Sequence, residues 1–319
     1  MSEIAAEAKI SPVPAPRSAL WRFLDSDLFY SFIGSPATVA SAVITLLLVA
    51  TALAAPLIAP HNPFDPASLS IGDSLLPPVW SHNGVSDYLL GTDDQGRDVL
   101  STILYGMRIS LSVGFASVLL AIAIGVPLGL AAGYFGGYAD ALIMRVADVK
   151  LTFPAILTAL LIDGVARSIA GPQAYNDVVF PVLVLSIGLS FWVQYARTVR
   201  GSVLVEANKE YVLAARLIGL RPLAILFRHI LPNVLGPVLV IATINLALAV
   251  ITEATLSFLG VGVPPTQPSL GTLIRIGNDY LFSGEWWITI FPGITLAVLV
   301  LAVNLLGDWL RDALNPKLR

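Results

Sequence analysis

Few residues have the type and spacing to support chemistry, and most of them lie in two short segments. Four charged residues stand within six positions, at Asp93, Asp94, Arg97 and Asp98. Such a cluster either contacts another protein or braces its own loop through internal ion pairs, and we favour the brace. Glu253 is the other candidate, because an ionisable side chain at the edge of a long apolar stretch is a functional-site hypothesis by default. The alternative that we favour is an interfacial carboxylate bonded to backbone.

Nothing in the residue pattern supports an enzyme. The sequence has no glycine-rich phosphate loop ending in Lys-Ser/Thr, so we do not expect the chain to hydrolyse ATP. There is no credible Ser/His/Asp or paired-carboxylate arrangement, and there is no cysteine. His61 and His82 lack the spacing of metal ligands, and His229 suits structural capping. We therefore predict no catalytic residue, no metal site and no cofactor.

The composition requires a large surface that faces lipid. Hydrophobic residues make up 56% of the 319 positions and charged residues only 12%, with a mean hydropathy of +0.81. A soluble domain carries about 25% charged residues, so this chain has too little polar surface to face water everywhere. The net charge of −3, without a basic stripe, predicts no nucleic-acid partner.

Five uncharged stretches approach or exceed the roughly 20 residues that cross a bilayer. They are Pro36–Ala59, Ile109–Ala139, Val178–Ala196, Ile230–Thr252 and Trp286–Gly307. A sixth stretch, Asp140–Ala166, is ambiguous, because charged residues precede its short apolar part. A buried or surface helix is the alternative for it.

The placement of basic residues favours six spans with both termini in the cytoplasm, because Lys and Arg collect on that side. If the sixth stretch spans, 14 of the 18 basic residues face inside. The four that face outside are Arg97, Arg108, Arg167 and Arg275. If it does not span, the basic segment 197–228 would face outside, against the rule. In the six-span arrangement, Arg145 and Asp148 project beyond the bilayer and can pair along their helix.

The segment from Glu206 to Asn233 is expected on the cytoplasmic side and predicts two short helices. The first covers about Val203–Ile218, and Gly219 suits the left-handed position that ends a helix. Pro222 suits the first turn of the next helix. One face of the first helix carries Tyr211, Ala214, Ala215 and Ile218. Small alanines allow a partner to approach closely, although an amphipathic helix lying on lipid explains the face equally well.

This segment resembles the coupling loop of ABC importer permeases. That pattern reads Glu-Ala-Ala, three residues, Gly, nine residues, then Ile-x-Leu-Pro. The matching positions are Ala214, Ala215, Gly219, Leu231 and Pro232. Leu213 replaces the Glu and His229 replaces the Ile, as in the peptide/nickel subfamily. Four further segments, which begin at Leu90, Gly133, Glu253 and Asn304, resemble the same subfamily. The long external loop and the carboxyl end resemble its C-type subunit.

The resemblance implies an all-α membrane protein with the type I ABC importer permease fold. It implies import of small solutes, foremost di- and oligopeptides, with nickel, glutathione or another solute as alternatives. It also implies a bacterial inner membrane location. The implied partners are a homologous second permease subunit, two ABC ATPase subunits and an extracytoplasmic solute-binding protein, besides membrane lipid.

The resemblance also assigns roles along the chain. Residues 1–35 would form a cytoplasmic tail with an interfacial helix, 36–108 the first span and the external loop, 109–310 the permease core, and 311–319 a cytoplasmic tail. The ATPase-coupling residues would be Glu210, Tyr211, Ala214, Ala215, Arg216 and Gly219. Thr243 and Asn245 are polar members of the fifth span and candidates for lining a passage.

Two other classes of membrane protein remain as alternatives. A stand-alone carrier or channel would place ion sites on broken helices or acidic residues in mid-membrane, whereas the centres of these spans are uncharged. An integral membrane enzyme is disfavoured, because the chain has no catalytic arrangement.

Overall fold

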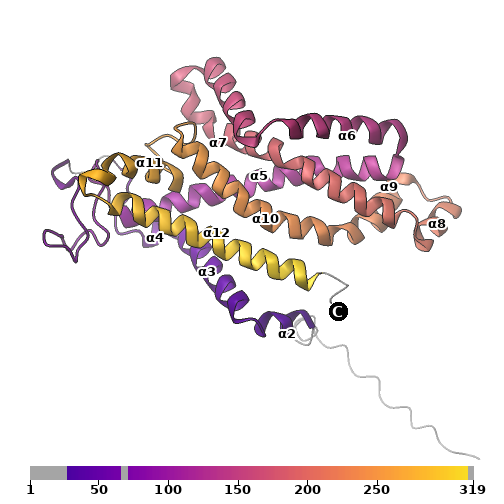
Figure 1. Cartoon of the computed structure of the whole chain (residues 1–319), viewed down its shortest axis with the longest axis horizontal. Coiled ribbons are helices and arrows are strands. Elements are labelled where there is room, and N and C mark those ends of the chain that lie inside the picture. The colour runs from indigo at the N-terminus through magenta and orange to yellow at the C-terminus, as the bar shows by residue number, and fades with distance from the viewer. Residues whose placement is uncertain (1–26, 66–70, 315–319) are drawn as a thin grey trace, which may run out of the picture.

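The computed structural model describes residues 27–65 and 71–314, and the elements in these ranges are all helical (Figure 1). The long helices are α3 (Pro36–Leu53), α5 (Val99–Phe135), α6 (Gly137–Thr152), α7 (Ala155–Glu206), α10 (Leu231–Phe258) and α12 (Trp287–Ala313). The shorter ones are α2 (Asp27–Ile33), α4 (Ala55–Ile58), η2 (Ile71–Asp73), α8 (Glu210–Leu217), α9 (Pro222–Ile225), the π-helical turn η3 (Leu226–Ile230), α11 (Leu270–Tyr280) and η4 (Leu281–Ser283). Residues 1–26 of the predicted amino-terminal tail and residues 315–319 lie outside the described ranges.

Five segments are long and apolar enough to cross a membrane, and a sixth qualifies if a bent helix pair counts as one span. The bent pair joins α6 to the first part of α7, Ala155–Gly171, at an angle of 90°. The predicted six spans agree with this count if the bent pair is one span, but the sixth is then not one straight helix. The reason is local: Pro154 disfavours a helical conformation at the residue before it, and Phe153 is extended. A second break follows at Gly171, whose φ is 73°.

Most of the long helices run along the longest axis of the molecule, and several connecting segments lie at its two ends, whereas the first part of α7 projects from one side (Figure 1). The short helices α8 and α9 define one end, which we name the α8 end. The opposite end, the loop end, carries α11 and the segment between α4 and α5. The end of α12 lies toward the α8 end, where Trp309 packs edge-on against Phe32 of α2 at 5.1 Å between ring centroids. The described chain therefore begins and ends on the same side of the bundle.

The closest helix packing joins α5 to α7 through a row of glycines. A Cβ atom at Gly125 would lie 2.4 Å from the Trp192 carbonyl oxygen, and one at Gly129 would lie 2.5 Å from the Ala196 carbonyl oxygen. At Gly133 it would lie 2.7 Å from the Val203 side chain. At these three positions there is no room for a side chain between α5 and α7. Within lipid, helices associate through such close contacts because apolar surface alone gives little preference for a neighbour.

Two ion pairs fix α6 against the second part of α7. Arg200 binds both carboxylate oxygens of Asp140, and Arg197 binds Asp148. The predicted pair between Arg145 and Asp148 is therefore wrong, because Asp148 instead reaches across to the neighbouring helix.

Helix limits differ from the predictions where side chains cap a helix or interrupt it. The second span begins at Val99 rather than Ile109, because the Asp98 carboxylate caps the helix by accepting the Ser101 N–H at 2.9 Å. The single helix expected over Val203–Ile218 is divided. It breaks after Glu206 and resumes at Glu210 because Lys209 is extended. The helix α11 was not predicted, although Ser269 caps its start.

The glycine row gives a direct test of the α5–α7 interface. Replacement of Gly129 by Ala should lower the amount of folded protein and its unfolding temperature, because the added carbon meets helix backbone that cannot turn aside. Gly201, in α7, has open space around its Cβ position, so Gly201→Ala is the matched control. It should be neutral or stabilising by up to about 1 kcal/mol. Thermal unfolding of the purified protein measures both, and equal effects at the two positions would contradict the interface.

Candidate functional site

Tyr211 ties α8 to the two long helices beside it. Its hydroxyl donates to Glu206 Oε1 at the end of α7 (2.6 Å) and accepts from Asn233 Nδ2 at the start of α10 (3.1 Å). Asn233 also donates to the His229 carbonyl oxygen (2.6 Å), and Lys209 pairs with Glu206 (2.7 Å). Burial and the hydrogen bond to Glu206 raise the pKa of Tyr211 to about 12, so the hydroxyl remains protonated near neutral pH. Tyr211 therefore connects α8 to both α7 and α10.

The end of α8 has the predicted backbone. Gly219 has a φ of 80°, in the left-handed region. The Leu220 N–H donates to the Ala215 carbonyl oxygen (3.1 Å), and the Gly219 N–H donates to the Arg216 carbonyl oxygen (3.0 Å). This pattern is the Schellman motif that terminates helices. Any side chain at position 219 would be strained by roughly 1–2 kcal/mol.

The two alanines of α8 lie on different faces. Ala215 is buried with Val212 in the core of this chain, whereas Ala214 is exposed. Ala214 is free to face a partner, and that role stays a prediction, whereas burial of Ala215 removes it from the predicted small surface. The small size of Ala215 is explained by packing within the chain.

The outer face of α8 and its neighbours is apolar and exposed. The large side chains on it are Leu213, Leu217, Ile218 and Leu223. Leu217 and Ile218 are 88% and 76% exposed. Glu210 and Arg216 are also exposed there, and the Arg216 guanidinium lies 4.9 Å from the Tyr134 ring centroid, which ties α8 to α5. Contiguous exposed apolar side chains among charged ones mark interaction surfaces.

Thr243 and Asn245 lie between the helices of this chain. Asn245 is fully buried beside the Tyr195 hydroxyl of α7. The Thr243 hydroxyl donates to the Val240 carbonyl oxygen (2.8 Å) and faces Gly307 of α12, where a Cβ atom would lie 2.7 Å from it. Their role in lining a passage stays a prediction.

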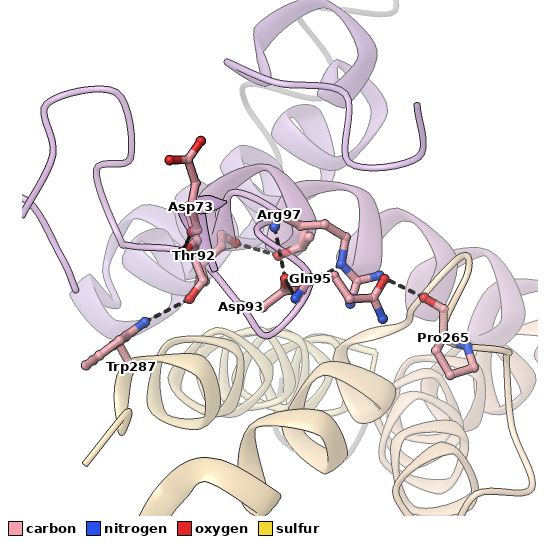
Figure 2. A network of polar contacts seen from close by, with 9 residues as sticks. Asp73, Thr92, Asp93, Gln95, Arg97, Pro265 and Trp287 are labelled. Atoms are coloured by element: carbon pink, nitrogen blue, oxygen red, sulfur yellow. Dashed lines mark hydrogen bonds and ion pairs between the residues drawn. The ribbon is translucent and has the colours of Figure 1, made fainter. Parts of the chain in front are cut away.

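At the loop end, Asp93 and Arg97 form a buried ion pair (Figure 2). Asp93 Oδ2 accepts from Arg97 Nε (2.6 Å), and its Oδ1 accepts the backbone N–H groups of Gln95 and Arg97, each at 2.9 Å. Arg97 Nη1 donates to the Pro265 carbonyl oxygen (2.8 Å), which belongs to the connection between α10 and α11. Both side chains are 2% exposed or less. This geometry favours the brace over direct contact with another protein.

The rest of the charged cluster supports the same loop. Asp98 is buried, and it caps α5. Asp94 is half-buried, and burial together with the adjacent Asp93 carboxylate raises its pKa. Trp287 at the start of α12 donates its indole N–H to the Thr92 carbonyl oxygen (3.1 Å), as Figure 2 shows. The loop is thereby fixed to α5 and α12.

Two buried carboxylates have partners that the sequence did not reveal. Glu253 is bonded to the hydroxyls of Ser110 and Ser257 rather than to backbone. Asp163, in the first part of α7, pairs with Arg167 (2.7 Å) and accepts the Tyr175 hydroxyl across the break at Gly171. The spacing of Asp163 and Arg167, four residues apart on a helix, was the available signal for that pair.

Metal binding finds no support in residues 27–65 and 71–314, where no group of three potential ligands occurs. His61 packs against Tyr88, with 5.2 Å between ring centroids, and its Nδ1 lies 3.9 Å from Asp98.

The fold defines a class of protein. A bundle with five or six apolar spans, a short exposed helix at one end and a braced loop at the other is a polytopic helical membrane protein. The structure resembles the inward-facing MetNI methionine ABC transporter, with a TM-score of 0.51 and 24% identity, over 68% of this chain and 97% of that one. That likeness establishes the fold.

Sequence comparisons identify the family. Residues 125–319 match the binding-protein-dependent transport system inner membrane component family, and residues 26–78 match the N-terminal TM domain of oligopeptide transport permease C. This chain belongs to that family of ABC importer permeases, and it is a multi-pass protein of the bacterial inner membrane. The predicted resemblance is confirmed.

Named relatives are similar over nearly the whole chain. The di/tripeptide transport system permease protein of Pseudomonas aeruginosa is 38% identical over 96% of this chain and 94% of its own length. The dipeptide transport system permease protein of Haemophilus influenzae is 39% identical over 96% and 97%. The glutathione transport system permease protein of Pectobacterium atrosepticum is 37% identical over 98% of each.

The buried pair predicts a specific pattern of stability. Arg97→Ala should lower the yield of folded protein, because it leaves Asp93 charged, buried and without its cation, at a cost of about 3–5 kcal/mol. Adding Asp93→Asn should restore part of the yield. An Asn Oδ1 can still accept both backbone N–H groups, while no unpaired charge remains. Yield and unfolding temperature after extraction measure this. Normal stability of Arg97→Ala would contradict the brace.

Proposed function

We propose that this chain is one transmembrane half of an ATP-driven importer of di- and oligopeptides. A homologous permease subunit forms the other half, two ABC ATPase subunits dock at the α8 end, and a solute-binding protein delivers the substrate at the loop end. The α8 end then faces the cytoplasm, in agreement with the distribution of basic residues.

The observation that carries the proposal is the exposed apolar face of α8 together with the Tyr211 tie behind it. Leu217 and Ile218 project from an end of the bundle that is rich in basic residues. A groove on a partner accounts for such a face at an end of the bundle that lies in water. Tyr211 allows movement of α8 to reach the long helices, because it connects α8 to both α7 and α10.

The mechanism follows from this connection. ATP binding closes the ATPase pair and displaces α8, and the hydrogen bonds of Tyr211 pass the displacement to the spans. The two halves then alternate between outward and inward access. The sequence lacks a phosphate-binding loop, in keeping with hydrolysis in separate subunits.

The proposed peptide substrate is inferred from the substrates for which the relatives are named. Two of those described above are named for di- or tripeptides and a third for glutathione, itself a small peptide-like solute. The substrate class can be tested in vesicles that contain the complete transporter. The measurement is uptake of radiolabelled dipeptides and of radiolabelled glutathione, with ATP supplied first inside and then outside the vesicles.

The docking face has its own test. Leu217→Asp should leave the chain folded in the membrane but reduce co-purification of the ATPase subunits at least about tenfold, because a charge would be buried unpaired in the contact. Leu89→Asp makes the same change at an exposed leucine of the loop end and should retain the ATPases. A full ATPase complement in Leu217→Asp would overturn the assignment of α8. Ala215→Asp is unsuitable for this test, because Ala215 is buried within the chain.

A further inference from the structure

Glu253 is a fully buried carboxylate near the loop end of α10. Its Oε2 accepts the hydroxyl of Ser110 on α5 (2.7 Å), and its Oε1 accepts the hydroxyl of Ser257 on α10 (2.6 Å). Both oxygens are thus occupied by hydroxyl donors rather than by a cation. Burying a carboxylate in this way costs free energy. We therefore expect Glu253 to do more than fill space.

The two serines extend the contact to the connection between α10 and α11. The Val263 N–H donates to the Ser257 hydroxyl (3.4 Å), and the Leu270 N–H donates to the Ser110 hydroxyl (3.3 Å). A hydroxyl has one hydrogen to donate. Because Glu253 accepts that hydrogen from both serines, their lone pairs are left to face the two N–H groups. Glu253 therefore holds the connection through the two serines at Val263 and at Leu270, where α11 begins. The Ser269 hydroxyl also lies within hydrogen-bond reach of the Glu253 carboxylate.

Little space is left for this connection to shift. A Cβ atom at Gly271 would lie 2.3 Å from the Ala254 carbonyl oxygen, and one at Gly106 would lie 3.1 Å from the Pro268 carbonyl oxygen. The same connection is held from two other sides, by Arg97 at the Pro265 carbonyl oxygen (2.8 Å) and by Arg167 at the Gly260 carbonyl oxygen (3.4 Å). The main polar groups of the loop end thus converge on residues 259–269.

One helix joins this point to the α8 end. α10 runs unbroken from Leu231 to Phe258, with Glu253 and Ser257 near its last turn and Asn233 in its first. Asn233 donates to the Tyr211 hydroxyl of α8 (3.1 Å). Residues 259–269 and α8 are therefore attached to the two ends of one helix, which is continuous through Pro237.

We propose that Glu253 is a positioning residue that locks the α10–α11 connection to α10, so that events at α8 are transmitted to the outer surface through α10. The inference rests on the proposed function, because it takes the ATPases at α8 as the source of the motion. Allosteric transmission of this kind requires one structural element whose conformational equilibrium is shifted by both α8 and the α10–α11 connection. Without Glu253, α10 still moves, but the connection no longer follows it.

Spin labels on single cysteines test the proposal in the complete transporter, because this chain has no cysteine of its own. The positions are Thr266→Cys on the exposed part of the connection and Ile218→Cys on α8. The probe is ATP with vanadate, compared with no nucleotide, and the readout is the ratio of shifted to unshifted spectral components. With Glu253 present, both labels should respond. With Glu253→Gln, the response at position 266 should fall at least about fivefold, the lower end of ordinary coupling between sites, while that at position 218 persists.

Glu253→Gln suits this purpose because it keeps size and shape but replaces one acceptor by a donor. That donor competes with the backbone N–H for a serine hydroxyl. Ser257→Ala removes only one of the two serine contacts of Glu253, so the response at position 266 should fall partway. This variant replaces Glu253→Gln in the test if Glu253→Gln fails to fold. Thr252→Ala, whose hydroxyl bonds within its own helix, is the matched control and should respond fully.

The outcomes distinguish a failure of the role of Glu253 from a failure of ATPase docking at α8. A full response at position 266 in Glu253→Gln, or in Ser257→Ala if only that variant folds, would overturn the role of Glu253. A response at position 218 but none at position 266 with Glu253 intact would overturn transmission through α10. If position 218 itself does not respond to ATP and vanadate, the proposed docking at α8 fails, whatever Glu253 does.

Discussion

The constraint on which this structure depends is that helices in lipid gain little by burying apolar side chains against one another. Cohesion must come from close backbone contact and from polar groups that lipid cannot satisfy. Gly125, Gly129 and Gly133 supply the close contact by letting α5 approach α7. The polar groups are concentrated toward the two ends, where Tyr211 and the Asp93–Arg97 pair each join several elements. The bundle is thus a tightly packed middle between two polar junctions.

This distribution suits a transporter that is driven from outside its own chain. A rigid middle moves as a body, so force applied at one end reaches the other. The α8 end offers an exposed apolar face, and the loop end offers a connection held by Arg97, Arg167 and the serines that bind Glu253. α10 links the two ends without a break. On the proposed function, we expect alternating access to come from rotation of a whole half rather than from rearrangement within it.

Local signals allowed much of the framework to be predicted. Long uncharged stretches located the spans, and the helix-ending glycine at position 219 has the expected left-handed backbone. The four charged residues from Asp93 to Asp98 suggested a brace, and the geometry favours it. In each case, the physical cause lies within a few residues of the signal.

The features that escaped prediction depend on contacts between distant segments. Burial of Ala215 is set by the segments that pack around α8, and periodicity alone could not assign it to the inner face. Asp148 prefers Arg197, 49 positions away, over the nearby Arg145. Glu253 finds Ser110 from another helix, 143 positions away. The 90° bend at Phe153 had a local cause in Pro154, but prolines elsewhere in the spans, such as Pro127, stay within helices.

The central claim is that α8 is the contact through which separate ATPase subunits drive this chain. A photo-crosslinking amino acid at position 218, introduced into the transporter in native membranes, tests it most directly. The account predicts a crosslink to an ATPase subunit whose yield changes when ATP is added, and none to it from position 89 at the loop end. Crosslinks from position 218 only to lipid or to this chain itself would contradict the account.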